Sequence, residues 1–161
     1  MRVGIGYDVH GLGEGRRLVL GGVDIPFHKG LMGWSDGDVV VHAIIDALLG
    51  AAVLGDIGTH FPSDDPQFKD ISSLVLLERT RDLLEGWGWG VGNIDVTIVA
   101  QEPKLAGFID GMRGRVSQSL AIDKERIGIK AKTADELGVV GRGEGIAAYA
   151  VALLEEPHEN P

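Results

Sequence analysis

Apolar and polar residues follow two different spacings along this chain, and each spacing predicts a kind of element. Alternation, or a short apolar run bounded by turn residues, is typical of strands, whereas apolar positions three and four residues apart are typical of helices. The strand pattern occurs at residues 2–9, 18–20, 23–25, 94–98 and 127–131. The helix pattern occurs at residues 35–54, 70–85 and 105–120. For the apolar run 146–154, periodicity alone does not separate a helix from a strand.

Local signals place some of the boundaries. Gly21-Gly22 lies between two short apolar runs and favours a two-residue hairpin turn. Ser35 and Asp38 form a weak capping box where the first helix begins. Strands and helices in this order predict an α/β or α+β fold with helices packed on one sheet. The 161 residues are expected to form a single domain over 1–156, followed by a polar tail at 157–161.

Charge and composition narrow the classes of partner. The net charge of -9 argues against nucleic acid and anionic membranes as partners. If the substrate is a phosphate, positive charge must therefore be concentrated locally or supplied by metal ions. The chain has no cysteine, which excludes disulfides and thiolate chemistry and agrees with a reducing compartment. With no signal peptide and no apolar run of membrane-spanning length, we expect a cytoplasmic protein.

Asp8 and His10 end the first predicted strand and are the strongest candidates for chemistry. Residues i and i+2 of a strand point to the same face, so this carboxylate and imidazole should project together. His42 follows on the first predicted helix, and two histidines with one aspartate can hold a divalent metal with an open coordination position. The set suits Zn²⁺ and also non-haem Fe(II). The alternative interpretation is a capped strand end with a histidine satisfied in the core.

Asp38 and Asp46 flank His42 at a spacing of four residues and share its helix face. One interpretation is that one of them orients the imidazole as its hydrogen-bond partner. The other is that Asp38 is a helix-start charge favoured by the helix dipole. We favour the second interpretation for Asp38 and leave Asp46 open.

Two further segments carry polar groups at predicted strand ends. Around the strand 127–131 and the glycine-rich stretch 138–145 lie Lys130, Lys132, Thr133, Asp135 and Arg142. A hydroxyl with turn amides can bind phosphate there, although the stretch lacks P-loop spacing and a solvated turn explains it as well. The loop 101–104 is either a binding loop at a strand end or a plain connection with a proline near a helix start.

These segments occur together in one order along the chain. They are Asp8-Val9-His10, Ser35-Asp36-Gly37-Asp38 with His42, Asp46-Ala47-Leu48-Leu49-Gly50, Gly55-Asp56-Ile57-Gly58, Asp95-Val96-Thr97-Ile98, Pro103-Lys104 and Gly141-Arg142-Gly143-Glu144-Gly145. In this combination the chain closely resembles the 2-C-methyl-D-erythritol 2,4-cyclodiphosphate synthase family of the non-mevalonate isoprenoid pathway. The resemblance extends to about Leu154. Some relatives carry an added cytidylyltransferase domain, which we do not expect here.

The resemblance implies a fold, an assembly and a reaction. The fold is α/β (α+β sandwich), with a single mixed β-sheet and helices on one face, and the run 146–154 becomes a strand. The protein is expected to be a homotrimer with active sites at subunit interfaces. The 2-phosphate of 4-diphosphocytidyl-2-C-methyl-D-erythritol 2-phosphate attacks the β-phosphorus and CMP leaves, so catalysis rests on positioning and on charge stabilisation by metals.

The resemblance also assigns site residues by position. Zn²⁺ is expected at Asp8, His10 and His42, and a second cation, Mg²⁺ or Mn²⁺, at the diphosphate with Asp135. Asp56 and Gly58 match ribose contacts, the loop 100–106 matches the cytosine pocket, and Arg142 lies towards the trimer axis. Catalytic roles fall on Trp34 and Thr133. The full set of expected substrate contacts is Asp8, His10, Trp34, Ser35, Asp56, Ile57, Gly58, Phe61, Ser63, Asp65, Ala100, Lys104, Leu105, Ala106, Lys132, Thr133, Asp135, Val139 and Arg142.

At four positions the chain departs from the family pattern. Trp34 replaces a histidine in the loop over the reacting phosphates; its indole N–H can donate a hydrogen bond but cannot take up a proton or carry a positive charge, so we expect it to act by closing the loop and excluding water. Asp135 replaces a glutamate and is expected to reach its metal through water. Lys132 replaces a threonine and adds charge near the diphosphate, and Val139 replaces a phenylalanine.

Two other functions agree with parts of the pattern. One is a trimeric protein that binds a metal or a small molecule and has lost turnover, which Trp34 suggests. The other is a zinc hydrolase acting on a nucleotide or phosphate ester.

Overall fold

A five-stranded sheet forms the centre of the computed structural model, which describes residues 1–156; the polar tail expected at 157–161 lies outside the described residues. The strands are β1 (Arg2–Glu14), β2 (Leu18–Leu20), β3 (Val23–Ile25), β4 (Lys29–Leu31), β5 (Gly90–Val99), β6 (Ile127–Lys132) and β7 (Gly145–Glu155). The α-helices are α1 (Val39–Ala52), α2 (Ile57–His60), α3 (Ser73–Gly86), α4 (Ile109–Leu120) and α5 (Gly138–Gly141). Short 3₁₀ turns cover Pro66–Phe68, Ala106–Phe108 and Lys124–Arg126.

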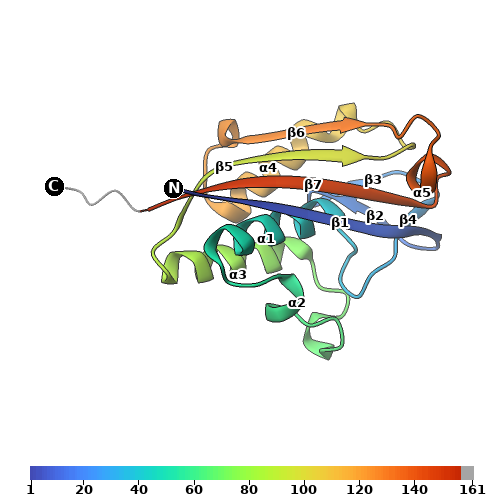
Figure 1. The fold of residues 1–161 in the computed structure, drawn as a ribbon. Helices are drawn as coiled ribbons and strands as arrows, with labels where there is room; N and C mark the ends of the chain where they lie inside the picture. Colours follow the sequence, from blue (N-terminus) through green and yellow to red (C-terminus); the bar gives the residue numbers. More distant parts are fainter. Residues whose placement is uncertain (157–161) are drawn as a thin grey trace.

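The central sheet is mixed, with the strand order β4-β1-β7-β5-β6. Strands β5 and β6 run parallel, whereas β1 pairs antiparallel with β4 and β7, and β5 pairs antiparallel with β7. The start of β1 lies beside the end of β7, where Arg2 pairs with Leu154 (Figure 1). The mixed α/β fold is confirmed.

The hairpin of β2 and β3 corrects the expectation of a single sheet. These strands form a separate two-stranded ribbon with Leu20 opposite Val23. Gly21 and Gly22 form its turn with φ of 57° and 75°, a backbone conformation that glycine adopts without strain. The buried side chains of the ribbon, Leu18, Leu20 and Ile25, belong to the same hydrophobic core as the central sheet.

The helix α1 lies directly against β1, and two glycines allow this close approach. A Cβ atom on Gly4 would lie 2.0 Å from the carbonyl oxygen of Ala47, and one on Gly6 would lie 1.9 Å from that of Ala43. The even-numbered positions of β1 therefore face α1, and the register runs backwards along the helix as the strand advances. Continuing this register brings residues 8 and 10 beside the first turns of α1.

The three long helices, α1, α3 and α4, lie on one face of the central sheet (Figure 1), which confirms that expectation. The opposite face carries large exposed apolar side chains from β1 and β7, namely Val3, Ile5, Tyr7, Val9, Tyr149 and Val151. On the helix side, Ile94, Val96 and Ile98 of β5 are fully buried, as their alternation predicted. The odd positions of β1 are apolar and nevertheless point away from the helices.

Several element boundaries differ from the sequence predictions for local reasons. The first helix begins after Asp38, whose carboxylate accepts a hydrogen bond from the backbone N–H of Val41, so Ser35 is not its cap. The helix expected at 70–85 begins at Ser73 because Asp70 adopts a left-handed conformation with φ of 57°. The helix expected from residue 105 begins at Ile109, after a 3₁₀ turn. The ambiguous run 146–154 is part of strand β7.

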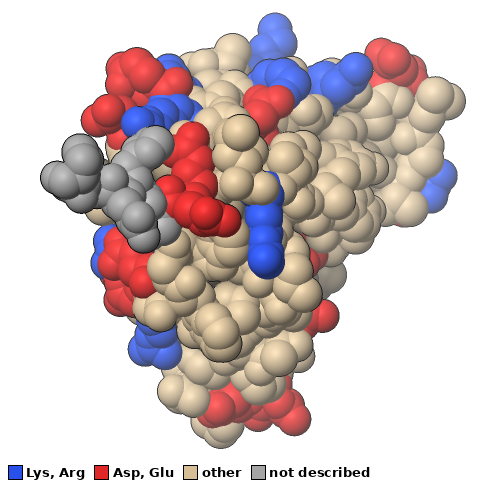
Figure 2. Space-filling view, turned by 60° about the vertical axis from the view of Figure 1, so that its left-hand side comes forward, with Lys and Arg blue, Asp and Glu red and all other residues tan. Residues whose placement is uncertain are grey.

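Three short elements, β4, α2 and α5, were not predicted, because three or four residues are too few to show a period. The equally short β2 and β3 were predicted through the Gly21-Gly22 turn between them. No helix in residues 1–156 combines the length and the apolar character needed to cross a bilayer. On the face shown in Figure 2, acidic side chains are interleaved with basic ones and most of the surface is uncharged.

Candidate metal centre and substrate pockets

Asp8, His10 and His42 come together at one point, as their sequence pattern predicted. The Oδ2 atom of Asp8 lies 2.9 Å from His10 Nε2 and 2.9 Å from His42 Nδ1. The two histidine nitrogens are 3.3 Å apart. β1 supplies the first two side chains on its helix-facing side, and the first turn of α1 supplies the third.

These three atoms form a triangle that fits a divalent metal. Ligand atoms at about 2.0–2.1 Å from a tetrahedral Zn²⁺ are roughly 3.3 Å from one another, close to the separations of 2.9–3.3 Å found here. Three protein ligands leave a fourth position open, which is typical of catalytic rather than structural zinc sites. Within the described residues this is the one cluster of three or more His, Cys, Asp or Glu with such geometry.

The electrostatics of the cluster favour a charged carboxylate. Burial by itself would raise the pKa of Asp8, but hydrogen bonds and charge interactions with His10 and His42 outweigh it and lower that pKa to about 2. The hydrogen bond to Asp8 raises the pKa of His10. The Nδ1 atom of His10 lies 2.5 Å from the carbonyl oxygen of Met32, which accepts a hydrogen bond from it, and Nε2 of the same ring is directed at the cluster.

Two serine hydroxyls contact Nε2 of His42, the ring nitrogen that faces away from the cluster. This Nε2 atom lies 3.0 Å from Ser35 Oγ and 2.8 Å from Ser73 Oγ. Ser73 Oγ in turn donates a hydrogen bond to Asp36 Oδ1 at 2.5 Å. The imidazole is therefore oriented by a chain of polar groups that ends in a carboxylate.

Neither acidic neighbour on the helix face hydrogen-bonds to the imidazole of His42 among the described contacts. Asp38 instead caps α1 and accepts hydrogen bonds from the backbone N–H groups of Gly21, Gly22 and Val41. Its complete burial raises its pKa to about 6. Asp46 accepts a hydrogen bond from the backbone of Ile57 at 2.8 Å, and burial raises its pKa as well. The helix-start interpretation of Asp38 is thus confirmed.

A cavity of about 230 Å³ opens over the cluster. Besides the three metal-type residues, its lining includes six further predicted positions, which are Trp34, Ser35, Ile57, Gly58, Phe61 and Ser63. The indole N–H of Trp34 donates a hydrogen bond to the carbonyl oxygen of Asp65 at 2.9 Å, and Lys69 Nζ lies 5.9 Å from the centre of its ring. The backbone oxygen of Trp34 also accepts from Asp70 N at 2.8 Å. Trp34 therefore ties the loop before α1 to the loop 62–70.

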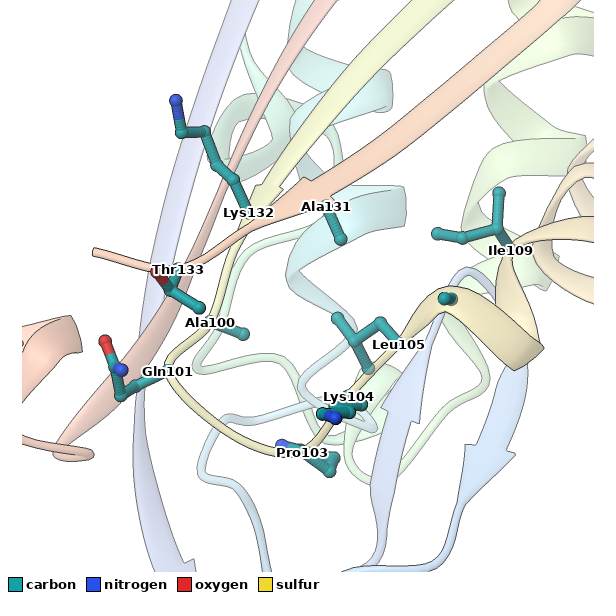
Figure 3. Close-up of a pocket in the computed structure, with 10 residues that line it drawn as sticks. Ala100, Gln101, Pro103, Lys104, Leu105, Ile109, Ala131, Lys132 and Thr133 are labelled. Atoms are coloured by element: carbon teal, nitrogen blue, oxygen red, sulfur yellow. The ribbon is translucent and has the colours of Figure 1, made fainter. Parts of the chain in front are cut away.

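A second and larger cavity, of about 510 Å³, lies at the carboxyl ends of β5 and β6 (Figure 3). Its lining includes the predicted positions Ala100, Lys104, Leu105, Ala106, Lys132 and Thr133. Figure 3 shows Ala131, Leu105 and Ile109 around the hollow, whereas the long side chain of Lys132 extends away from it. A cavity of this size accommodates a small organic ligand.

The remaining predicted residues lie outside these two cavities. Asp56 caps α2 by accepting hydrogen bonds from Thr59, and the carboxylate of Asp65 accepts from Gln67. Asp135 lies on the loop after β6, where its amide is 3.3 Å from Thr133 Oγ1. Arg142 pairs with Glu144, and Val139 of α5 lines a cavity with Tyr7 and Tyr149 on the face of the sheet opposite the three long helices.

Sequence reasoning gave no role to several residues that the structure places at the site. Ser73 and Asp36 contact the imidazole of His42 directly or through one hydroxyl, while Phe68 and Leu76 line the metal-site cavity. The pair Ser72-Ser73 before an apolar run signals a helix start. Nothing in that signal connects it with a histidine 31 positions earlier in the chain.

The fold and the Asp–His–His cluster define a mixed α/β protein with a candidate divalent-metal site. The YgbB family model matches residues 1–155, and the chain belongs to this family. A curated relative from Dehalococcoides mccartyi (strain CBDB1), the enzyme 2-C-methyl-D-erythritol 2,4-cyclodiphosphate synthase, is 60% identical over 97% of this chain and 99% of its own length. The synthase of the same name from Syntrophomonas wolfei is 58% identical over 97% of this chain and 99% of its own length.

Solved structures agree with the sequence relatives. A 2C-methyl-D-erythritol-2,4-cyclodiphosphate synthase described as a CDP-bound form has a TM-score of 0.88 and 36% identity, covering 96% of this chain and all of its own. The bifunctional IspDF of Campylobacter jejuni has a TM-score of 0.93 and 42% identity, covering 96% of this chain and 42% of that one.

Proposed function

We infer that this chain is an enzyme with 2-C-methyl-D-erythritol 2,4-cyclodiphosphate synthase activity, acting in the non-mevalonate isoprenoid pathway. The observation that carries this inference is the identity of 60% over 97% of the chain to a curated synthase. The convergence of Asp8, His10 and His42 in a cavity supports it independently, because a phosphate reaction on an acidic chain needs a bound source of positive charge.

The reaction is an intramolecular phosphoryl transfer. An oxygen of the substrate's 2-phosphate attacks the β-phosphorus, the bond from that phosphorus to the bridging oxygen breaks, and CMP leaves with that oxygen. No protein nucleophile and no water molecule is consumed. The protein therefore has to hold the two phosphorus centres close together and to stabilise the charge that shifts between them.

Asp8 Oδ2, His10 Nε2 and His42 Nδ1 would hold Zn²⁺, since their separations of 2.9–3.3 Å suit tetrahedral coordination. When bound, the metal supplies Lewis-acid polarisation of phosphate oxygens. The hydrogen bond from His10 Nδ1 to the carbonyl of Met32 fixes the orientation of that ring. The low pKa of Asp8 keeps its carboxylate ionised at neutral pH.

The nucleotide end of the substrate is assigned to the larger cavity. Six residues of the loop 100–106 line a hollow large enough for a cytosine ring, and Lys132 and Thr133 lie at its rim. A CDP-bound form among the solved relatives supports a CDP-linked substrate. We assign the second cation, Mg²⁺ or Mn²⁺, to the diphosphate with Asp135, and a catalytic contact to Thr133; both lie on the loop after β6.

The arrangement of the two cavities supports a homotrimer with active sites between subunits. On one chain, the metal cluster and the Lys132–Thr133 rim line separate cavities, whereas the reaction requires both ends of one substrate to be held. The face of the sheet opposite the three long helices exposes Ile5 and Tyr7 to the extent of 71% and 50%, and a neighbouring subunit would cover both side chains. Arg142 would then lie towards the axis of the trimer.

Trp34 is proposed to close the metal-site cavity. Its ring lines the cavity while its N–H binds the carbonyl of Asp65, so it joins two loops across the opening. Closure excludes water, which strengthens electrostatic interactions at the reacting phosphates and suppresses hydrolysis.

From the sequence we also assign the protein to the cytoplasm, and we assign residues 1–156 to a single domain.

One experiment separates this function from its rivals. Purified protein is incubated with 4-diphosphocytidyl-2-C-methyl-D-erythritol 2-phosphate, Zn²⁺ and Mg²⁺, and the products are followed by ³¹P NMR. CMP and the cyclic diphosphate in equal amounts support the synthase. Linear hydrolysis products would indicate a zinc hydrolase, and binding without turnover would indicate a protein that has lost the activity.

A further inference from the structure

We propose that Ser73 and Asp36 are positioning residues that determine which ring nitrogen of His42 is available to the metal. The inference rests on the proposed metal site and adds two residues that do not touch the metal. Its basis is a buried hydrogen-bond chain that runs from the imidazole through one serine to one carboxylate.

The two nitrogens of His42 face different groups. Nδ1 lies 2.9 Å from Asp8 Oδ2 and 3.3 Å from His10 Nε2, on the side of the cluster. Nε2 lies 2.8 Å from Ser73 Oγ, on the opposite side of the ring. A neutral imidazole carries one proton, and the nitrogen without it is the one that can bind a metal. The partner of Nε2 therefore decides whether Nδ1 is a ligand.

The direction of the hydrogen bonds follows from Asp36. Its carboxylate, when ionised, only accepts hydrogen bonds, and Ser73 Oγ is 2.5 Å from Asp36 Oδ1. The hydroxyl proton of Ser73 is thus committed to Asp36. Ser73 Oγ then offers only lone pairs to His42, so Nε2 must carry the proton and donate it. In the metal-loaded protein Nδ1 is then left with a free lone pair, directed at the position that Asp8 and His10 also face.

The chain is built to keep this direction. Asp36 Oδ2 accepts a hydrogen bond from Ser73 N at 3.0 Å, and Asp36 Oδ1 also accepts from Asp38 N at 3.1 Å. Asp36 N donates to the carbonyl of Ile71 at 3.0 Å. Ser73 is fully buried at the first residue of α3, so water does not compete for its hydroxyl.

Ser35 completes the network without reversing it. Its Oγ lies 3.0 Å from His42 Nε2 and 3.4 Å from Ser73 Oγ, and it accepts a weak hydrogen bond from Gly37 N. If the hydroxyl of Ser35 donates to Ser73 Oγ, then Ser35 Oγ can also accept a hydrogen bond from the Nε2–H group of His42. Unlike Ser73, Ser35 has no carboxylate partner among the described contacts, so nothing comparable fixes the direction of its hydroxyl.

The experiment measures Zn²⁺ affinity by competition with a chromophoric chelator, for the wild type and for the variants Ser73→Ala and Asp36→Asn. Removing a partner of a metal-binding histidine typically costs 10- to 100-fold in affinity, and we expect a loss in this range for each variant. Because both act through one hydroxyl, the double variant should lose little more than Ser73→Ala alone. Ser119→Ala removes another buried serine hydroxyl, far along the sequence in α4, and should leave the affinity unchanged.

A spectroscopic readout separates positioning from general damage to the fold. In the Co²⁺-loaded protein, Ser73→Ala should change the visible ligand-field absorption, while Ser119→Ala should not. Long-range ¹H–¹⁵N NMR of the Zn²⁺-loaded wild type, which needs no variant, should show the proton of His42 on Nε2. Variants with wild-type Zn²⁺ affinity would overturn the proposal while leaving the metal site standing, whereas a proton on Nδ1 would exclude that nitrogen as a ligand and overturn the proposal together with the assignment of His42 to the metal site. A wild type that binds no Zn²⁺ would overturn both.

Discussion

Asp38 is a fully buried carboxyl group that joins the hairpin turn to the start of α1. It accepts hydrogen bonds from the backbone of Gly21, Gly22 and Val41, yet its burial still raises its pKa to about 6. In the unfolded chain the same group ionises near its ordinary pKa of 3.8. Between these two pH values the folded protein holds a proton that the unfolded chain has released.

We therefore predict that Asp38 makes the protein less stable as the pH rises from about 4 to about 6, with no further effect above that range. The difference between the two pKa values corresponds to roughly 3 kcal/mol. Chemical denaturation of the wild type and of Asp38→Asn across this range checks the prediction. The variant should lack this part of the pH dependence, and identical slopes for the two proteins would contradict it.

Trp34 links two loops over the metal-site cavity, and this predicts different effects for two substitutions. Trp34→Ala should lower kcat/KM by roughly tenfold or more, because water gains access to the cavity. Trp34→Phe keeps an aromatic ring but loses the hydrogen bond to the carbonyl of Asp65, so its loss should stay within about fivefold. Trp87→Ala, which removes an exposed tryptophan outside that cavity, is the control. Steady-state kinetics in which Trp34→Ala equals the wild type would rule out closure.

At the scale of elements, the contact between β1 and α1 builds the metal centre. The strand turns its even positions towards the helix, and glycines at two of these positions bring the two backbones together. Asp8 and His10 continue the same face, and His42 meets them from the first turns of α1. The close contact between β1 and α1 that the glycines allow is thus the same contact that brings Asp8, His10 and His42 together.

Gly6→Ala should therefore be strongly destabilising. The added Cβ would lie 1.9 Å from the carbonyl oxygen of Ala43, so strand and helix must separate at a cost of about 3 kcal/mol. Gly114→Ala in α4 meets nothing within 4 Å and should stabilise the protein by about 0.5–1 kcal/mol, the usual gain in a helix. Denaturant midpoints measure both changes. A tolerated Gly6→Ala would show that the close approach is not required.

Local patterns predicted most elements, because a strand, a helix or a hairpin leaves its period in the sequence. The Gly21-Gly22 turn and the alternation at Ile94, Val96 and Ile98 are examples. The spacing of Asp8 and His10 predicted their shared face for the same reason. Starts of helices were less well predicted, since Asp70 and the 3₁₀ turn at 106–108 delay them through local backbone geometry.

Contacts between distant segments could not be predicted from spacing. Asp38 and Asp46 share a helix face with His42, and one of them was a reasonable candidate to orient its ring. The packing of α3 against α1 instead brings the hydroxyl of Ser73 to Nε2 of His42. The tie between Trp34 and the loop 62–70 also depends on tertiary structure alone.

At the scale of the whole molecule, two features point to an assembly. The metal-type cluster and the larger cavity at the ends of β5 and β6 are separate on one chain, and an apolar face of the sheet is exposed. A trimer would cover this face and complete each active site with a neighbouring subunit.

Ile5→Glu should therefore shift the protein from trimers to monomers and abolish most activity, because a charge in the middle of the interface is costly to bury. Val53→Glu places the same charge at an exposed apolar residue after α1, outside the sheet, and should leave a trimer. Sedimentation velocity distinguishes these outcomes. A monomeric wild type, or trimers of Ile5→Glu, would contradict the proposed assembly.

The origin of the oxygen atoms in the products distinguishes intramolecular transfer from attack by water. The substrate is converted in H₂¹⁸O with Zn²⁺ and Mg²⁺, and CMP and the diphosphate product are analysed by mass spectrometry. Intramolecular attack of the 2-phosphate predicts a cyclic diphosphate and CMP, both without solvent oxygen. Incorporation of ¹⁸O into either product would show attack by water and would contradict the synthase account.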